Sequence, residues 1–266
     1  MKILFAGRDN SFNRKIVDEL SAEHEVVACF FLEPNRRKFS NRYKRILARI
    51  KRYGIIRVMD ELLFHVFDRT YIRKPEQKLF LTKPDYYITS MPLKCPTYEV
   101  ENIHDSRWLD LIRTLAPDII FSMCCNVIFK PELYTIPPLG TFVLHEGITP
   151  EYKGLHTNLW ALLKREHAYI GFSLIQVNNN LDGGPLLAQG GYSLKPEENY
   201  RMWSWISHNA LIEALGDIKE ALRNLDNNKG FTPLETGTRK SGTYTWMTFS
   251  QVIRLLFASR NAGKIN

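Results

Sequence analysis

Continuous apolar segments near the start of the chain predict buried parallel strands. Residues 2–6 (KILFA) and 25–32 (EVVACFFL) are almost entirely apolar, as strands covered on both faces of a parallel sheet usually are. Between them, residues 10–20 are predicted to form a helix, capped at its N-terminus by Asn10 or Ser11. A strand, a helix and a second strand in this order form a βαβ unit. The sequence therefore predicts an α/β fold with a Rossmann-like, mostly parallel central sheet.

The alternation of strands and helices continues along the chain. Further strands are predicted at 85–89, 118–122, 141–145 and 171–177, and further helices at 108–115, 158–164 and about 202–225. A polar loop and a short basic tail are expected after the last helix. The dinucleotide fingerprint GxGxxG is absent, because Gly7 is followed by RDNS. We therefore predict no nicotinamide or flavin cofactor.

Residues 36–80 interrupt this alternation and are predicted to form a helical insertion that packs on the α/β core. Two helices are expected to separate near Gly54, with these apolar residues at helical spacing: Ile46, Leu47, Ile50, Val58, Met59, Leu62, Leu63 and Val66. The first part is strongly basic and contains no acid, with Arg36, Arg37, Lys38, Arg42, Lys44, Arg45, Arg49, Lys51, Arg52 and Arg57. This charge favours a phosphate-bearing partner or a solvated helix face. A less favoured alternative is weak contact with a membrane surface.

The bulk properties are typical of a globular protein. The chain has 266 residues, of which 44% are hydrophobic and 24% are charged, which argues against disorder. We divide it into a catalytic domain at residues 1–200 and a small C-terminal extension at residues 201–266.

The cysteines and the apolar segments indicate the cellular compartment in which the protein is expected. Cys29, Cys95, Cys124 and Cys125 lack the spacing of a zinc site or a disulfide framework, so we predict reduced thiols and no metal. No segment reaches the roughly 18 apolar residues that a membrane-spanning helix needs. A cytoplasmic protein is the resulting prediction.

Two polar loops follow neighbouring predicted strands and carry the candidate chemistry. His145 stands at the end of one strand, and Asp182 follows the next in an Asp-Gly-Gly-Pro turn. Ligands of open α/β sheets bind at the carboxyl ends of strands, so both side chains are expected at one site. A histidine there is suited to general acid or base catalysis, and a nearby aspartate could orient it. A surface histidine and an ordinary turn are the alternatives for each residue considered alone.

The spacing within these loops resembles the folate-dependent formyltransferase family, which includes glycinamide ribonucleotide, methionyl-tRNA and sugar N-formyltransferases. His145, Pro150, Tyr152 and Gly154 match the family signature Asn-x-His-Pro-Ser-Leu-Leu-Pro-x-Tyr-x-Gly without a gap. Asp182 matches the aspartate of the family's Leu-Asp-(Gly/Thr)-Gly turn. The resemblance covers about residues 85–190 and, loosely, the first strand and helix.

The resemblance implies a fold, a formyl donor and a set of roles. The fold is the Rossmann-like formyltransferase fold, and the donor is 10-formyltetrahydrofolate, bound as a cosubstrate. His145 would stabilise the oxyanion or accept the amine proton, and Asp182 would orient it and assist proton transfer. The pterin ring would lie against Val127, Ile128 and Phe129, and hydrogen-bond the backbone of Asn178, Asn179, Asn180 and Leu181. The alternative for residues 127–129 is simple core packing.

One position departs from the family signature. Val143 occupies the place of the catalytic asparagine, whose amide stabilises the developing oxyanion. Asn126 is a candidate for a substitute amide. Two alternative functions follow: a catalytically impaired binding protein that kept the fold, or a hydrolase that releases formate from formyltetrahydrofolate.

The acceptor is predicted to be a small amine that carries phosphate. A nucleotide-linked amino sugar fits the basic surface, with a glycinamide-like phosphorylated amine as the alternative. Transfer RNA is not expected, because only about 65 residues follow the core and tRNA-type enzymes carry a sizeable extra domain. The oligomeric state stays open, with a dimer as one alternative.

Overall fold

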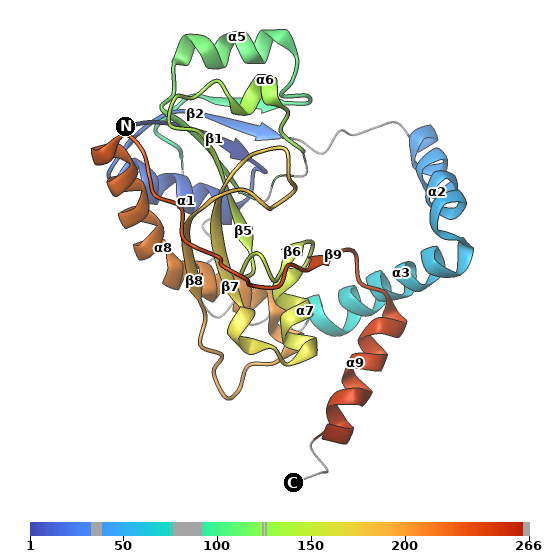
Figure 1. Ribbon diagram of the computed structural model, residues 1–266. Coiled ribbons are helices and arrows are strands. Elements are labelled where there is room, and N and C mark those ends of the chain that lie inside the picture. Colours follow the sequence, from blue (N-terminus) through green and yellow to red (C-terminus); the bar gives the residue numbers. More distant parts are fainter. Residues whose placement is uncertain (33–38, 75, 77–91, 124, 126, 263–266) are drawn as a thin grey trace.

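Strands whose residues are apolar on both faces form the centre of the protein. The computed structural model describes residues 1–32, 39–74, 76, 92–123, 125 and 127–262 (Figure 1). A seven-stranded sheet has the order β3-β2-β1-β4-β5-β7-β8. Its parallel part consists of β1 (Lys2–Gly7), β2 (Glu25–Leu32), β3 (Thr97–Val100), β4 (Ile119–Met123) and β5 (Thr141–Glu146). Two antiparallel strands, β7 (Gly171–Gln176) and β8 (Leu186–Gly191), complete it. The predicted mostly parallel α/β fold is confirmed.

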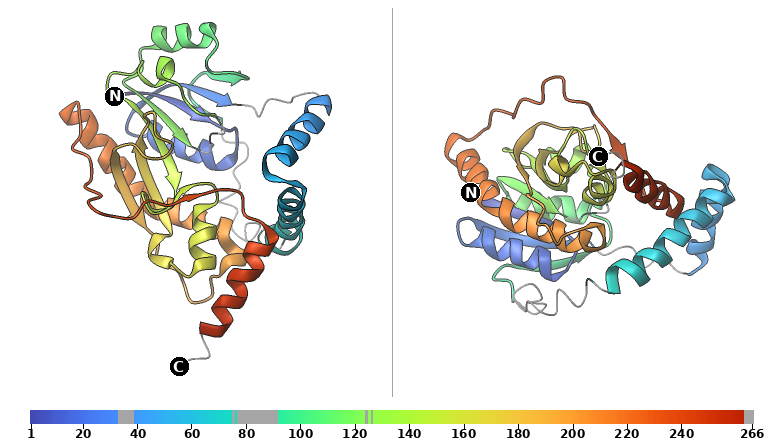
Figure 2. Two further views of the ribbon diagram at one scale, coloured as in Figure 1. Left: turned by 45° about the vertical axis from the view of Figure 1, so that its right-hand side comes forward. Right: turned by 90° about the horizontal axis from the view of Figure 1, so that it is seen from below.

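Helices cover both faces of this sheet (Figures 1 and 2). Along β1, Ile3 and Phe5 enter one buried cluster and Leu4 and Ala6 the other, as strand alternation requires. The first cluster receives α1 (Ser11–Ser21), α7 (Thr157–Lys164) and α8 (Trp203–Asn228). The second receives α5 (Ser106–Leu115) and α6 (Pro131–Tyr134). The sheet is therefore the middle layer of three.

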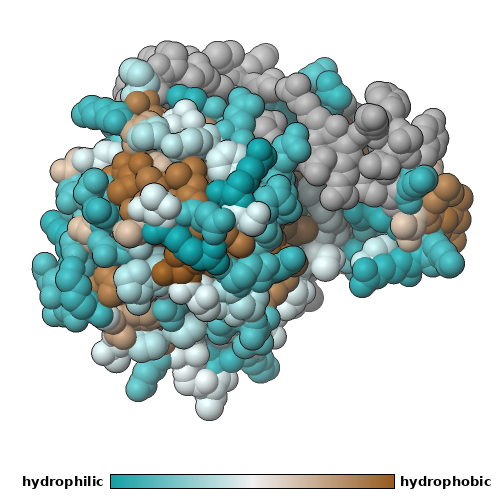
Figure 3. Space-filling view, turned by 90° about the horizontal axis from the view of Figure 1, so that it is seen from above, coloured by the Kyte–Doolittle hydropathy of each residue, from teal (hydrophilic) through white to brown (hydrophobic). Residues whose placement is uncertain are grey.

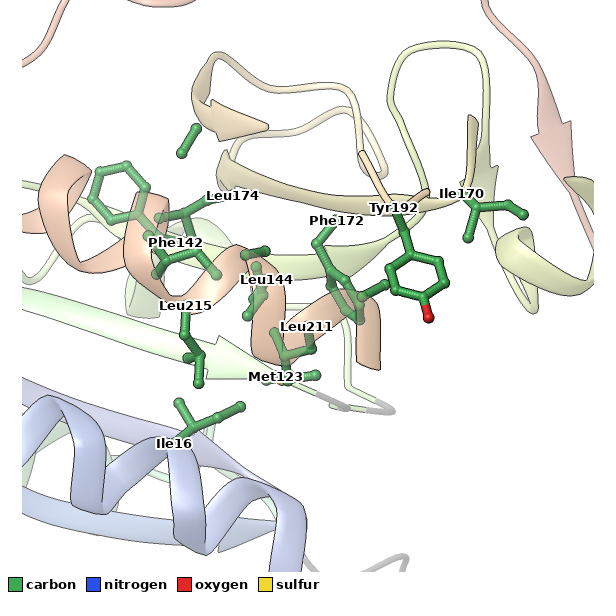
Figure 4. Close-up of a cluster of buried hydrophobic side chains, with 14 of the residues drawn as sticks. Ile16, Met123, Phe142, Leu144, Ile170, Phe172, Leu174, Tyr192, Leu211 and Leu215 are labelled. Carbon is green, nitrogen blue, oxygen red and sulfur yellow. The ribbon is translucent and has the colours of Figure 1, made fainter. Parts of the chain in front are cut away.

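β5 and β7 pack one face against α8, so only the side chains on their other face can contribute to a binding site. Phe142, Leu144, Phe172 and Leu174 point into the cluster that α8 covers (Figure 4). The intervening residues of β5 consequently face the other side of the sheet. α8 belongs to the predicted C-terminal extension, residues 201–266. The boundary at residue 200 stays a prediction.

Most predicted elements are present, and some differ. The helix after β1 is confirmed, and Asn10 is its N-cap, since the Asn10 side chain accepts a hydrogen bond from Asn13 N at 2.8 Å. β3 and β8 were not predicted, and the strand predicted at 85–89 lies outside the described residues. The short basic tail is wrong in part: α9 (Phe249–Ala262) is a helix. Val252, Leu255 and Leu256 recur on one face of α9 and pack on the core, which explains its formation.

The insertion consists of α2 (Phe39–Tyr53), α3 (Ile55–Phe67) and the π-helical turn η1 (Asp68–Arg73). The predicted break is confirmed, because Gly54 separates the helices with φ +82°. Packing on the α/β core is only partly correct. Phe64 and Ile72 join the core, whereas α2 packs against α3 and projects outward (Figure 1).

Shorter elements complete the description. β6 (Lys153–Gly154) and β9 (Thr243–Tyr244) form a two-stranded parallel sheet, and η3 (His167–Tyr169) and η4 (Tyr200–Met202) are 3₁₀ turns. Within the described ranges, no helix combines the length and hydropathy needed to cross a membrane.

Candidate active site

The carboxyl end of β5 brings His145 to one edge of the sheet. Val143 and His145 lie two residues apart and therefore face the same side, opposite to Phe142 and Leu144. His145 is paired in register with Ser173 of β7, next to the antiparallel part of the sheet. Its side chain keeps 10% of its surface exposed, so it is reachable from solvent.

The loop after β5 folds back over the imidazole. His145 Nε2 lies 3.2 Å from the carbonyl oxygen of Tyr152. Because a carbonyl oxygen only accepts, Nε2 donates in this hydrogen bond. Tyr152 is itself almost fully buried and stacks on Tyr244 with 4.6 Å between ring centroids. The orientation of His145 is thus fixed by the folded loop.

Asp182 reaches the same place from the loop between β7 and β8. Its Oδ2 lies 3.9 Å from His145 Nδ1 and accepts a hydrogen bond from Gly154 N at 3.1 Å. A side chain at Gly154 would collide with the backbone of Tyr244, because a Cβ there would lie 2.1 Å from the Tyr244 oxygen, and φ is +104°. Gly154 thereby allows the close backbone approach that anchors Asp182.

Burial keeps the imidazole of the pair in its neutral form. Burial lowers the pKa of His145 from its ordinary value of 6.5, while the Asp182 carboxylate and the Tyr152 carbonyl act in the opposite direction. A neutral ring that donates from Nε2 has its lone pair on Nδ1, the nitrogen that faces Asp182. We expected Asp182 to orient the ring, but the hydrogen bond that does so is accepted by the Tyr152 carbonyl. Two acceptors therefore face each other, an arrangement suited to a ligand N–H group.

The residues predicted for pterin contact divide into three kinds. Phe129 is buried in the core cluster that α5 and α6 cover, and Val127 packs partly against that cluster. Ile128 is 75% exposed and Leu181 is 61% exposed. Only Val127 and Ile128 of the first stretch therefore keep surface for a ligand, whereas Phe129 has the position of a core residue.

The turn at residues 178–181 is held by its own asparagines. Asn178 Oδ1 accepts from Asn180 N at 2.8 Å, and Asn179 Oδ1 accepts from the Tyr134 hydroxyl of α6 at 2.8 Å. Tyr134 and Val127 contact the same buried cluster, so this turn and the 127–129 stretch lie on one side of the sheet. Asn126, the candidate substitute amide, falls outside the described residues.

Glu146 is a buried titratable group that the sequence analysis did not single out. Burial raises the pKa of Glu146 to about 7, although hydrogen bonds from Ser207 and the Asn158 backbone oppose this shift. The Ser207 hydroxyl of α8 donates to Glu146 Oε1 at 2.9 Å, on the face opposite to His145. Its position one residue after His145, on a strand that alternates between faces, was the only available signal.

Replacing Glu146 by glutamine is expected to stabilise the protein above pH 7. The pKa of Glu146 is higher in the folded protein than in the unfolded chain, so the free energy of unfolding falls as the pH rises from 4.5 to 7. The loss is up to about 3 kcal/mol. Glutamine keeps an acceptor for Ser207 without the buried charge. Denaturant unfolding at pH 5 and pH 8 measures the effect, with the exposed Glu197→Gln as the matched control. An equal change at both pH values would contradict the expectation.

Two further observations delimit the site. A surface hollow of about 410 Å³ lies between α1 and α8, and Lys15, Glu19 and Ile212 are among its lining residues, so it shares none of the candidate site residues. No group of three or more His, Cys, Asp or Glu in the described segments has the arrangement of a metal site. Fold and site thus define an α/β protein with a paired imidazole and carboxylate at the carboxyl end of β5.

The family model described as formyl transferase matches residues 1–204. The chain therefore belongs to the formyl transferase family, as the motif around His145 and Asp182 predicted.

Individual proteins of known sequence or structure match this chain over only part of its length or at low sequence identity. Over 109 residues the chain is 36% identical to the bifunctional polymyxin resistance protein ArnA of Wigglesworthia glossinidia brevipalpis; the match covers 41% of this chain and 16% of ArnA. The phosphoribosylglycinamide formyltransferase of Anaplasma phagocytophilum has a TM-score of 0.53 at 14% identity, covering 92% of this chain and 98% of that one. WlaRD, a sugar 3N-formyltransferase solved in the presence of dTDP and 5-N-formyl-THF, has a TM-score of 0.53 at 15% identity, covering 92% and 69%. These structural similarities establish the fold.

Proposed function

We propose that this protein transfers the formyl group of 10-formyltetrahydrofolate to the amine of a small, phosphate-bearing acceptor, specifically a nucleotide-linked amino sugar. The observation that carries the proposal is the approach of His145 Nδ1 and Asp182 Oδ2 to 3.9 Å at a partly open strand end. Membership of the formyl transferase family supports the reaction class.

The pair of acceptors suits an amine nucleophile. In the proposed step the unprotonated amine nitrogen bonds to the formyl carbon, and the bond from that carbon to the folate nitrogen breaks. His145 Nδ1 takes a proton from the attacking nitrogen, and Asp182 stabilises the resulting imidazolium. A proton is returned to the departing folate nitrogen, so the reaction is balanced.

The cosubstrate is proposed to lie beside the same pair. The exposed Ile128 and Leu181 offer apolar contact, and the backbone of residues 178–181 offers hydrogen-bonding groups. WlaRD, which has the same fold, was solved in the presence of a formyl-folate, and this supports the assignment at the level of the fold.

The nucleotide-sugar acceptor is supported by charge and by one structural neighbour. The net charge of +8 favours an anionic ligand, and WlaRD was solved in the presence of the nucleotide dTDP. A glycinamide-like phosphorylated amine is the competing acceptor, because a phosphoribosylglycinamide enzyme has the same fold.

An acceptor screen tests the proposal. The protein is incubated with 10-formyltetrahydrofolate and a panel of nucleotide-linked amino sugars, phosphorylated amines and unphosphorylated controls, and the products are identified by mass spectrometry. An added formyl group on a nucleotide sugar is the expected result. Formylation of glycinamide ribonucleotide alone would assign the other acceptor, and release of formate without any acceptor would assign a hydrolase.

A further inference from the structure

An exposed apolar stripe follows α3 on the side opposite to the buried Phe64. Ile55, Met59, Leu62 and Val66 recur every three or four residues and share one face of the helix. Each of the four is more than half exposed, and the adjacent Ile56 is 83% exposed. Soluble proteins rarely leave a contiguous apolar surface of this kind uncovered, so the stripe indicates a binding partner.

The acidic residues of α3 lie on its packed side. Glu61 is 8% exposed and pairs with Arg49 of α2 and with Arg57, the latter at 3.1 Å. Asp60 accepts a hydrogen bond from Ser250 N of α9 at 2.9 Å. The charges that could repel an anionic partner are therefore occupied by contacts within the protein.

The neighbouring helix supplies positive charge and more apolar surface. Lys44, Lys51 and Arg52 of α2 are exposed, as are Ile46 and Leu47. The segment from Arg36 to Arg57 contains no acid at all. Figure 3 shows hydrophobic side chains next to hydrophilic ones where this part of the molecule projects. We call α2 and α3 together the arm (residues 39–67).

An anionic lipid surface matches both features of the arm. A nucleic acid would take the positive charges and leave the apolar stripe in water. A second copy would cover the stripe, but it would bring together two acid-free segments of chains that each carry a net charge of +8. Lipid headgroups attract the basic side chains, and the layer beneath them accepts the apolar ones.

We propose that the arm binds the surface of anionic membranes. The apolar stripe of α3 enters the boundary between headgroups and acyl chains, and Lys44, Lys51 and Arg52 face lipid phosphates. This inference is independent of the proposed formyl transfer.

Vesicle sedimentation tests the proposal with the full chain. The protein is spun with phosphatidylcholine vesicles and with vesicles that also contain phosphatidylglycerol, at low and at high salt. We expect binding to the anionic vesicles and its loss at high salt, because screening weakens the attraction. Binding to neither kind at low salt would overturn the proposal.

Two sets of variants locate the binding surface. Reversing Lys44, Lys51 and Arg52 to glutamate is expected to weaken binding on the order of 100-fold. The reason is that each basic residue near an anionic surface raises the membrane affinity by a factor of about five. The pair Leu62→Ser and Val66→Ser is expected to weaken it at least about tenfold. The matched control reverses Lys94, Lys195 and Arg201, which lie outside the arm. All of these positions are on the surface, and circular dichroism checks that the variants fold.

Sedimentation velocity distinguishes the competing occupant. A concentration-dependent dimer that the Leu62→Ser and Val66→Ser pair abolishes, with no loss of vesicle binding, would assign the arm to a second copy and reject the membrane. Equal weakening by the control reversals would show that only net charge matters, which also rejects a dedicated arm. A monomer whose vesicle binding falls only in the arm variants supports the proposal.

Discussion

Replacing His145 by alanine is expected to lower kcat/KM for formyl transfer by about 10²–10⁴, the range that general base catalysis contributes. The imidazole is held at the end of β5 by the Tyr152 carbonyl, and its free nitrogen faces Asp182. Alanine removes the acceptor and leaves the loop and the sheet in place. Binding of 5-formyltetrahydrofolate, measured by calorimetry, should survive the change.

A second histidine provides the control for this prediction. His167 in η3 is exposed, and His167→Ala should leave both transfer and folate binding unchanged. Full turnover by His145→Ala would remove His145 as the base. Asp182→Asn is expected to have a smaller effect, on the order of 10², since an amide oxygen can still accept the hydrogen bond from Gly154 N.

The pH profile of the wild type follows from the same residue. Burial places the pKa of His145 below 6.5, so the neutral imidazole persists at pH values where an exposed histidine would be protonated. The contribution of His145 to transfer should therefore be constant through neutral pH and fall only as the pH drops below 6.5. The acidic limb of kcat/KM should be absent from the residual activity of His145→Ala.

The sequence predicted five of the seven strands of the central sheet, because these five depend on local patterns. β1, β2, β4, β5 and β7 are apolar stretches bounded by polar loops, and their lengths of 5 to 8 residues favour strands over helices. His145 is the fifth of the six residues of β5, and Asp182 lies in the loop after β7. Because β7 runs antiparallel to β5, the carboxyl ends of these two strands lie at opposite edges of the sheet, and the loop after β7 brings Asp182 back to His145.

Features that depend on distant contacts were not predictable. The orientation of His145 comes from a backbone carbonyl seven residues away, which no side-chain pattern encodes. Phe129 resembles a ligand contact by motif, yet its burial against α5 and α6 depends on the packing of separate segments. The short strand β3 is defined by pairing with β2, and its four residues alternate too briefly to be recognised.

In the insertion, the sequence predicted the helices but not which of their faces is buried. Helical spacing correctly located α2 and α3, but spacing does not distinguish an apolar face that packs on the core from one that faces solvent. In α3, Glu61 and Phe64 lie on the packed face and Leu62 on the exposed one. The ion pairs of Glu61 with Arg49 and Arg57 make this orientation favourable, because they satisfy an acid that would otherwise be buried alone.

Restoring the family amide by Val143→Asn has the second large expected effect. Val143 lies two residues before His145 on the same side of β5, between Ser122 of β4 and Ile175 of β7. Asparagine branches at Cγ where valine branches at Cβ, and its amide would place an N–H donor beside the reacting carbon. If the protein transfers formyl groups slowly for want of that donor, kcat should rise by about 10²–10³, the contribution of one such group.

The Val143→Asp variant, which has the same shape as the asparagine variant, separates hydrogen-bond donation from polarity, since a carboxylate offers only acceptors. Transfer should rise with asparagine and not with aspartate, while thermal unfolding shows whether either polar group destabilises the half-buried position. Three results distinguish a formyltransferase from a binding protein. A gain in transfer identifies a formyltransferase that works below its chemical capacity. Unchanged, substantial transfer means that another group already stabilises the oxyanion, and Asn126→Ala then tests the nearest candidate in the sequence. No turnover in wild type or variant, with folate still bound, would leave a binding protein that kept the fold and the His145–Asp182 pair without the reaction.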